Sequence, residues 1–167
     1  MTQSANEEIF EDCKTKFGFV PNVIREMAKS RVPARLYLKA QEYLAEGVLT
    51  PQEQQAVQLA VSVENECHYC QAAHTAGGKM TGCELSDLES VKQGGLPGDP
   101  GMANVTHAAR LVVRKKGWLG EDELKELEQK GIDRARLYEI ITLIGLKTIT
   151  NYINHIAHTP IDDELKG

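Results

Sequence analysis

The sequence predicts a single all-α domain, and three observations carry that prediction. Apolar residues recur at helical spacing over most of the chain. No segment alternates apolar and polar residues as a half-buried strand does, and no Asn-Gly or Asp-Gly pair marks a hairpin turn. The chain has 167 residues, and a domain typically holds about 100–200. We therefore expect one helical bundle over 1–167, with its core in 33–158.

The first third of the chain predicts three helices. Apolar residues at helical spacing indicate a helix over 6–17, and the Gly-Phe-Val-Pro-Asn run that follows breaks it. A short helix is expected over 23–29. Pro33 suits the first turn of a further helix, which ends near residue 45 ahead of a glycine.

A strong start signal opens the centre of the chain. Thr50 is a natural N-cap, Pro51 suits the first helical position, and Glu53 completes a capping box. The helix that follows reaches about Asn65 and is apolar on most faces, so we expect it to be buried. A second buried helix is predicted over 67–80.

The last part of the chain predicts four more helices and one irregular loop. A short helix over 84–93 is followed by a loop at 96–101, because the density of Pro and Gly there opposes regular structure. Helices are expected over 102–116, 121–130 and 133–158. The last of these is apolar over more than one face, so we expect another subunit to cover part of it.

Charge and apolar patterning argue against several functions. The chain holds 24 acidic and 19 basic residues, a formal net charge of -5, so no basic face for a nucleic acid is expected. No apolar run approaches the ~18 residues of a membrane span. The first ten residues lack the basic and apolar regions of a secretory signal. We therefore expect a cytoplasmic protein, whose four cysteines are not a disulfide framework.

The chemistry is concentrated in one motif at the start of the second buried helix. Cys67, Cys70 and His74 stand at i, i+3 and i+7, within roughly 60° of one helical face. Two thiols and an imidazole are thus expected to converge. If Asn65 caps the helix, its N-terminus stabilises a thiolate. His74 lies one turn further on and titrates near neutral pH.

Three interpretations of this motif compete. A redox-active dithiol is favoured by the spacing and by a reducing compartment. A zinc site needs a fourth ligand, and the chain has no second Cys-x-x-Cys pair. The third interpretation is structural, with two small buried cysteines and a surface histidine.

The motif resembles a known family. The Cys67-x-Tyr69-Cys70-x-x-x-His74 pattern, placed after a buried helix that starts at Thr50, is similar to the alkyl hydroperoxidase D-like core of the carboxymuconolactone decarboxylase family. A Phe-Gly-Phe-Val-Pro-Asn run at 17–22 and an Asn-Tyr-x-Asn-His run at 151–155 match flanking elements of that family. The resemblance covers nearly the whole chain, so 1–167 is expected to be one alkyl hydroperoxidase D-like domain.

The resemblance implies a thiol peroxidase cycle. A thiolate attacks a hydroperoxide, and the resulting sulfenic acid condenses with the second cysteine to a disulfide. A thioredoxin-like or lipoyl protein then restores the dithiol. The resemblance makes Cys70 the attacking residue, Cys67 the resolving one and His74 part of a proton relay. The helix dipole alone favours Cys67 as the more acidic thiol, and here we follow the resemblance.

One departure from the family concerns that relay. The family usually has a glutamate twelve residues before the first cysteine, and this chain has Gln55 there. An amide cannot accept a proton at neutral pH. The candidate replacements are Glu64, which is nearest in sequence to the thiols, and Glu53.

Two further features stay open. Tyr69 either donates a hydrogen bond to a bound peroxide or packs in the core, and a polar stripe on the last helix either lines the site or caps the helix end. This stripe consists of Asn151, His155 and His158.

The predicted function is antioxidant reduction of hydroperoxides by a cytoplasmic enzyme that uses no cofactor and no metal. The resemblance also implies a homo-oligomer, a trimer or a hexamer. The first alternative is the lactone-acid decarboxylation that gives the family its name, for which the Cys-x-x-Cys pair is not expected to be needed. The second is a non-catalytic redox-sensing or zinc-binding protein.

Overall fold

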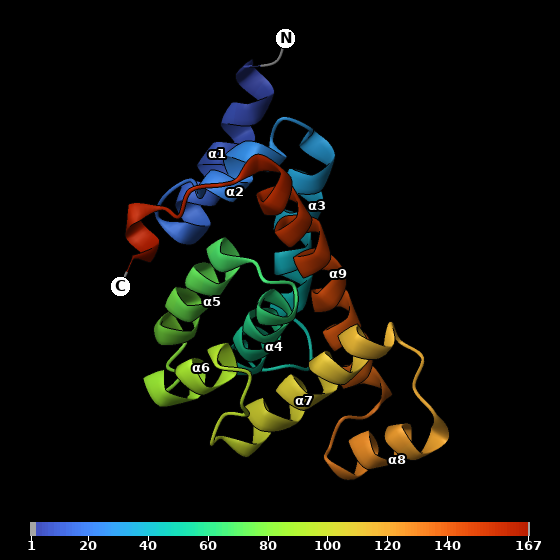
Figure 1. Cartoon of the computed structure of the whole chain (residues 1–167). Coiled ribbons are helices and arrows are strands. Elements are labelled where there is room, and N and C mark those ends of the chain that lie inside the picture. The colour runs from blue at the N-terminus through green and yellow to red at the C-terminus, as the bar shows by residue number, and fades with distance from the viewer. Residues whose placement is uncertain (1–2, 167) are drawn as a thin grey trace.

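The computed structural model describes residues 3–166, which form a single all-helical domain with no strand. The predicted fold class is confirmed. Figure 1 labels the nine α-helices of these residues. Their bounds are α1 Gln3–Phe17, α2 Asn22–Met27, α3 Arg31–Ala45, α4 Pro51–Glu64, α5 His68–Met80, α6 Leu85–Lys92, α7 Pro100–Lys115, α8 Glu121–Gln129 and α9 Arg134–Ala157, followed by the 3₁₀ helix η1 Asp163–Leu165.

Helix α4 is the centre of the bundle. It contacts α5, α6, α7 and α9 (Figure 1), and its residues from Ala56 to Ser62 are all buried. Its start is the predicted capping box: Thr50 Oγ1 accepts from the Glu53 backbone N–H at 3.2 Å, and Glu53 Oε2 accepts from the Thr50 backbone N–H at 2.8 Å. Arg136 of α9 pairs with the same Glu53 carboxylate. The start of α4 is thereby fixed against α9.

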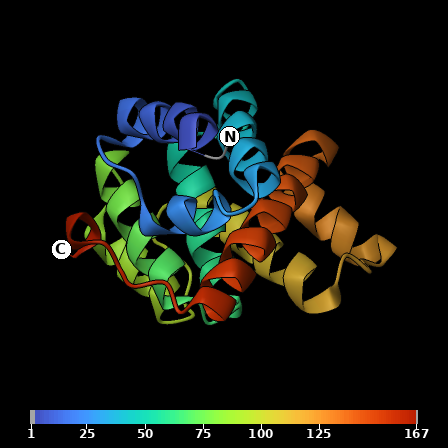
Figure 2. The ribbon, with the colours of Figure 1, turned by 90° about the horizontal axis from the view of Figure 1, so that it is seen from above.

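The two chain ends close one end of the bundle. Helix α2 packs against α9, and η1 packs against α5. Figure 2 looks onto this end and shows α1, α2 and the C-terminal segment lying over the central helices. Asp162 holds the C-terminal segment against α2 and α5, because its carboxylate accepts hydrogen bonds from the Asn22 backbone N–H at 3.0 Å and from the Tyr69 hydroxyl.

The apolar core has two main parts. The larger lies between α4, α7, α8 and α9 and includes Val57, Val105 and Leu143. The second joins α1, α2 and α3 to the start of α5, where it includes both Cys67 and Cys70. The predicted thiol pair therefore sits inside a packed core at the closed end of the molecule.

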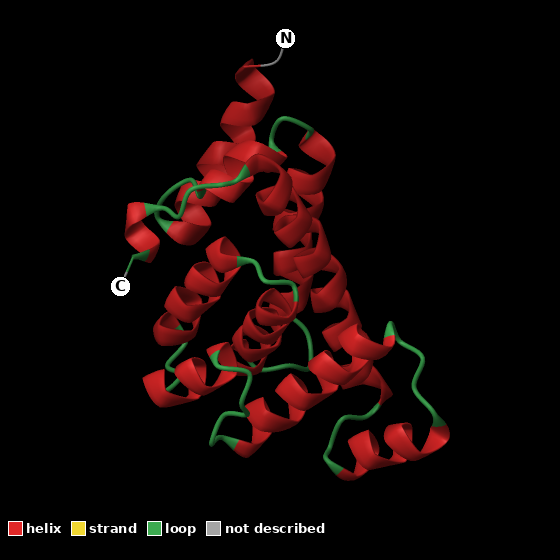
Figure 3. Ribbon diagram, in the orientation of Figure 1, coloured by secondary structure: helices red, strands yellow, loops and turns green. Residues whose placement is uncertain are grey.

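Two helices begin earlier than the sequence predicted: α1 begins at Gln3, three residues before the expected start, and α7 begins two residues early. Figure 3 shows the loop before this helix, which we expected to reach residue 101. The helix begins already at Pro100, because Asp99 caps it and accepts from the Met102 backbone N–H at 2.8 Å. Proline at the first helical position is compatible with such a start. The helix η1 was not predicted.

Gly78 permits the close packing of α5 on α6. A Cβ atom at Gly78 would lie 2.5 Å from Leu88 Cδ2, whereas a Cβ at Gly145 would meet nothing within 4 Å. We expect Gly78→Ala to lower the free energy of unfolding by about 1–3 kcal/mol, as overpacking does. Gly145→Ala, the matched helical control, should raise it by about 0.5–1 kcal/mol. Urea denaturation measures both, and equal effects would contradict this packing.

Candidate active site

The two cysteines of the motif lie next to each other at the start of α5. Cys67 is the N-cap residue and Cys70 lies in the first turn, and their side chains are 3.6 Å apart. Both are free thiols and almost fully buried, with exposures of 1% and 2%. Asn65, the predicted cap of this helix, instead ends α4 and donates through Nδ2 to Asn151 Oδ1 at 2.9 Å. Glu66, at a φ of 56°, makes the tight link between the helices and is exposed.

Polar groups of α9 surround the thiols. Asn154 Nδ2 lies 3.3 Å from Cys70 Sγ and 3.8 Å from Cys67 Sγ, and Thr150 Oγ1 lies 3.8 Å from Cys70 Sγ. Asn154 and Thr150 are buried at 4% and 1% exposure. Since α9 is more than 80 residues further along the chain, these contacts depend entirely on the tertiary fold.

The environment places the negative charge of the pair on Cys70. The pKa of Cys70 is lowered from 9.0 to about 5, chiefly because the Cys67 thiol donates to it and because Lys147 is positively charged, with smaller lowering effects from the neighbouring Thr150 and Asn151 side chains. Burial opposes this shift. The pKa of Cys67 is raised, since it donates its proton toward Cys70 and is buried. The helix-dipole expectation for Cys67 is therefore wrong, and Cys67 makes no capping hydrogen bond through its side chain.

This charge distribution predicts the pH dependence of alkylation. A thiolate whose pKa is near 5 is fully formed above about pH 6, so the labelling rate of Cys70 by iodoacetamide should rise through pH 5 and then stay level. Cys83 is the control within the same chain, because burial raises its pKa above 9.0. Its labelling should still be rising at pH 9. Mass spectrometry of the labelled peptides gives both profiles, and parallel profiles would contradict the assignment.

His74 joins a buried hydrogen-bond chain across the bundle. Its Nδ1 lies 2.9 Å from Gln55 Oε1 of α4, and its Nε2 lies 2.7 Å from Lys147 Nζ of α9. An ammonium group can only donate, so Nε2 accepts, and the ring proton sits on Nδ1, from which it is donated to Gln55. Burial, together with the positive charge of Lys147, lowers the pKa of His74 well below 6.5. The histidine is held neutral in one tautomer.

Gln55 stands where the relay glutamate was expected, and the structure brings it onto His74. Gly77 makes room for it, because a Cβ atom there would lie 2.7 Å from Gln55 Oε1. Of the two candidate replacements, Glu53 is held by Arg136 at the start of α4. Glu64 forms an ion pair with Arg114 of α7 at 2.7 Å and lies 3.5 Å from Arg110. Its carboxylate is thereby held against α7, and it does not join the His74 chain. Among residues 3–166, no Asp or Glu side chain lines the cavity beside Cys70.

Lys147 was not identified from the sequence, and the predicted polar face of α9 lies one turn too close to the end of the helix. The expected stripe began at Asn151, which is buried, but His155 and His158 are exposed near the end of the helix. The buried polar face instead begins one turn earlier, with members at i, i+3, i+4 and i+7. These are Lys147, Thr150, Asn151 and Asn154. Four polar residues at this spacing within an apolar helix were the signal that could have revealed them.

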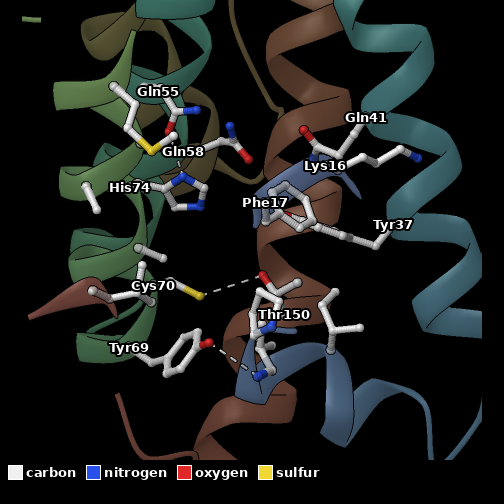
Figure 4. A pocket seen from close by; sticks show the side chains of 18 of the residues that line it. Lys16, Phe17, Tyr37, Gln41, Gln55, Gln58, Tyr69, Cys70, His74 and Thr150 are labelled. Carbon is white, nitrogen blue, oxygen red and sulfur yellow. Dashed lines mark hydrogen bonds between the residues drawn. The ribbon is translucent and has the colours of Figure 1, made fainter. Parts of the chain in front are cut away.

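A cavity of about 250 Å³ opens next to the thiolate. Figure 4 shows Cys70 and His74 projecting into it from α5, with Tyr37 and Gln41 opposite. Its lining is mainly apolar, and Cys70 and Lys147 both belong to it, whereas Cys67 does not. The amide of Gln58 also lines it, with a buried Oε1 that has no hydrogen-bond partner. A small, largely apolar molecule would meet Cys70 before Cys67.

Tyr69 lines the floor of this cavity, but its hydroxyl is already engaged. It donates to Asp162 and accepts from the Val23 backbone N–H at 3.3 Å. Burial and the bond to Asp162 raise the pKa of the phenol. Of the two interpretations that the sequence left open, the packing role fits these contacts.

The structure also bears on a metal site and on a membrane span. Within residues 3–166 no group of three His, Cys, Asp or Glu side chains is placed to hold a metal ion. Both ring nitrogens of His74 are instead occupied by Gln55 and Lys147. No helix in this part of the chain combines the length and apolar character that crossing a bilayer requires.

The all-helical bundle and the buried thiol pair define an alkyl hydroperoxidase D-like protein. Residues 33–112 match the Carboxymuconolactone decarboxylase family. The segment contains Gln55, Cys67, Cys70 and His74, so the resemblance seen in the sequence is confirmed. No curated protein matches the sequence.

Several solved structures share the fold. An uncharacterized peroxidase-related protein from Silicibacter sp. TM1040 is 21% identical, with a TM-score of 0.83, covering 99% of this chain and 89% of that one. A second peroxidase-related protein, an alkylhydroperoxidase AhpD core from Ralstonia eutropha JMP134, is 21% identical, with a TM-score of 0.81 and coverages of 95% and 87%. The debrominase Bmp8 is 16% identical, with a TM-score of 0.77 and coverages of 96% and 87%. At these identities the likeness concerns the fold.

Proposed function

We propose that the protein is a thiol-dependent peroxidase that reduces small organic hydroperoxides in antioxidant defence. The supporting observation is the Cys70 thiol, whose pKa is lowered to about 5 and which lines an apolar cavity with Cys67 directly behind it. A thiolate in contact with a resolving thiol is what a dithiol peroxidase needs. The relatives that are peroxidase-related by name support the same class.

The proposed cycle has three steps. Cys70 attacks the terminal oxygen of the hydroperoxide, which releases an alcohol and leaves a sulfenic acid on Cys70. The Cys67 thiol condenses with this sulfenic acid, and water leaves as the disulfide forms. A thioredoxin-like or lipoyl protein then reduces the disulfide by thiol exchange. His74 takes part by accepting a hydrogen bond from Lys147 and donating one to Gln55, which holds the Lys147 side chain in the cavity.

A turnover assay tests this function. With dithiothreitol as the reductant, the protein should consume many equivalents of cumene hydroperoxide, and a variant lacking Cys83 (Cys83→Ser) should turn over at the same rate. Consumption of a single equivalent with no further turnover would identify a redox sensor instead. No consumption at all would contradict the proposal.

A second candidate is reductive dehalogenation of a small aromatic ring. It is favoured by the mainly apolar cavity beside a thiolate and by the fold shared with debrominase Bmp8, of which a variant was solved in complex with 2,3,4-tribromopyrrole. The same dithiol would supply two electrons, so that a carbon–bromine bond becomes a carbon–hydrogen bond, with release of bromide and formation of the disulfide. Bromide release from 2,3,4-tribromopyrrole in the same assay distinguishes the two candidates.

We also propose a cytoplasmic homo-oligomer, because a dithiol is kept reduced there and α9 leaves an apolar face uncovered. Tyr138, Ile141, Tyr152 and Ile156 are between 43% and 83% exposed along this helix. Sedimentation velocity should give one species at three or six times 18.5 kDa. Ile141→Glu should dissociate it, and a monomeric wild-type protein would contradict the proposal.

A further inference from the structure

Lys147 brings a positive charge into the cavity without an acidic partner. It is 2% exposed, yet no Asp or Glu of residues 3–166 forms a salt bridge with its Nζ, whose hydrogen-bond partner is His74. Its neighbours are His74 Nε2 at 2.7 Å and the Tyr37 ring, whose centroid lies 5.3 Å away. Burying an ammonium without a carboxylate is unfavourable. The charge that compensates it in the cavity is the Cys70 thiolate, whose pKa Lys147 lowers.

The leaving oxygen of a hydroperoxide needs a proton, and His74 has none to give. Its Nδ1 proton is donated to Gln55 Oε1, and its Nε2 lone pair accepts from Lys147. The Tyr69 hydroxyl is committed to Asp162. Lys16 also lines the cavity, but it donates to the carboxylates of Asp12 and Glu42. The Lys147 ammonium has three protons, and within residues 3–166 only His74 takes one of them.

The position of Lys147 suits proton donation. Cys70 and His74 stand one helical turn apart on α5 and face the same cavity (Figure 4), and Lys147 contacts the His74 end. A hydroperoxide attacked by Cys70 Sγ directs its leaving oxygen away from the sulfur and into the cavity. Lys147 lines that cavity, with His74 fixing the direction of its Nζ.

We propose that Lys147 is the general acid of the cycle and protonates the oxygen that leaves when Cys70 attacks a hydroperoxide. This inference rests on the proposed peroxidase function. A bond forms between Cys70 Sγ and the terminal oxygen, and the oxygen–oxygen bond breaks. Its electron pair goes to the leaving oxygen, which takes a proton from Lys147 Nζ. The products are the alcohol, the Cys70 sulfenic acid and a neutral Lys147 amine, which water reprotonates.

The role of the acid is tested by changing the leaving group. An alkoxide, which leaves tert-butyl hydroperoxide, needs a proton, whereas acetate, which leaves peracetic acid, does not. The measured quantity is the rate constant for oxidation of Cys70 by tert-butyl hydroperoxide divided by the rate constant for its oxidation by peracetic acid. Both come from quenched single-turnover reactions followed by mass spectrometry. In Lys147→Arg the positive charge remains, but a guanidinium does not give up its proton. Lys79→Arg on the exposed part of α5 is the matched control.

We expect Lys147→Arg to lower this ratio by about 10²–10⁴-fold, the usual contribution of a general acid, while Lys79→Arg leaves it unchanged. Lys147→Met removes charge and proton together. Its absolute rates fall as the thiolate is lost, but its ratio should fall as it does in the arginine variant. A ratio that stays constant in both variants overturns the role of Lys147 alone. The wild-type protein provides the test of the function itself. If iodoacetamide labels Cys70 but neither peroxide oxidises it, the proposed function is wrong, and this inference is wrong with it.

Discussion

Cys70→Ser is expected to lower peroxide turnover by about 10³-fold or more, because the nucleophile is removed. Cys67 does not replace it, since it does not line the cavity and its pKa is raised by its bond to Cys70 and by burial. A serine hydroxyl is not ionised under these conditions. Turnover of cumene hydroperoxide with dithiothreitol measures the loss.

Cys67→Ser is the informative comparison for this variant. It should consume one equivalent of peroxide and stop, with a sulfenic acid on Cys70 that dimedone traps. Its oxidation should also be slower near pH 6, because the Cys67 thiol no longer lowers the pKa of Cys70. Cys70→Ser with wild-type turnover, or a dimedone adduct on Cys67 in that variant, would reverse the assigned roles.

Asp162→Ala is expected to lower the free energy of unfolding by about 3 kcal/mol. The carboxylate accepts from the Asn22 backbone N–H and from the Tyr69 hydroxyl, and the residue is 7% exposed. Each buried donor left without a partner costs about 1–3 kcal/mol. The loss also opens the closed end of the bundle over the cavity, where Tyr69 lies.

The next residue provides the control for this variant. Asp163 makes a surface ion pair with Lys166 and touches neither Asn22 nor Tyr69. Asp163→Ala should leave the unfolding midpoint unchanged, whereas Asp162→Ala should lower it by about 6–12 °C for a chain of this size. Thermal unfolding followed by circular dichroism gives both midpoints. Similar midpoints for the two variants would mean that Asp162 does not hold the chain ends together.

The helices could be predicted from the sequence because their signals are local. The capping box at Thr50 and Glu53 lies within four residues, and the structure forms it as expected. The pairing of Cys67 with Cys70 is equally local, since i, i+3 spacing on one helix fixes it. The start of α7 was placed two residues late, because the Pro and Gly density outweighed Asp99 as a cap.

The remainder of the site depends on contacts between distant segments. Lys147 meets His74 across 73 residues, and Asp162 meets Tyr69 across 93. Nothing in the local sequence assigns these partners. Glu64 illustrates the converse case, because its nearness to Cys67 in sequence suggested a catalytic role. Arg114, 50 residues away, takes its carboxylate instead.

Gln55 gains a physical explanation from the same contacts. A carboxylate there would accept the Nδ1 proton of His74 and favour a positive ring, but Lys147 Nζ faces the other ring nitrogen at 2.7 Å. A neutral amide keeps the ring neutral, so that Nε2 can accept from Lys147. The missing glutamate and the buried lysine are therefore parts of one arrangement.

The most direct test of the account is the mass of the protein after one equivalent of hydrogen peroxide. We expect the loss of about two mass units, mapped to a disulfide between Cys67 and Cys70, with Cys13 and Cys83 still free. The Cys67–Cys70 bond must disappear again on addition of dithiothreitol. If both thiols stay free, or if Cys70 advances to a sulfinic acid without pairing, the dithiol cycle is wrong.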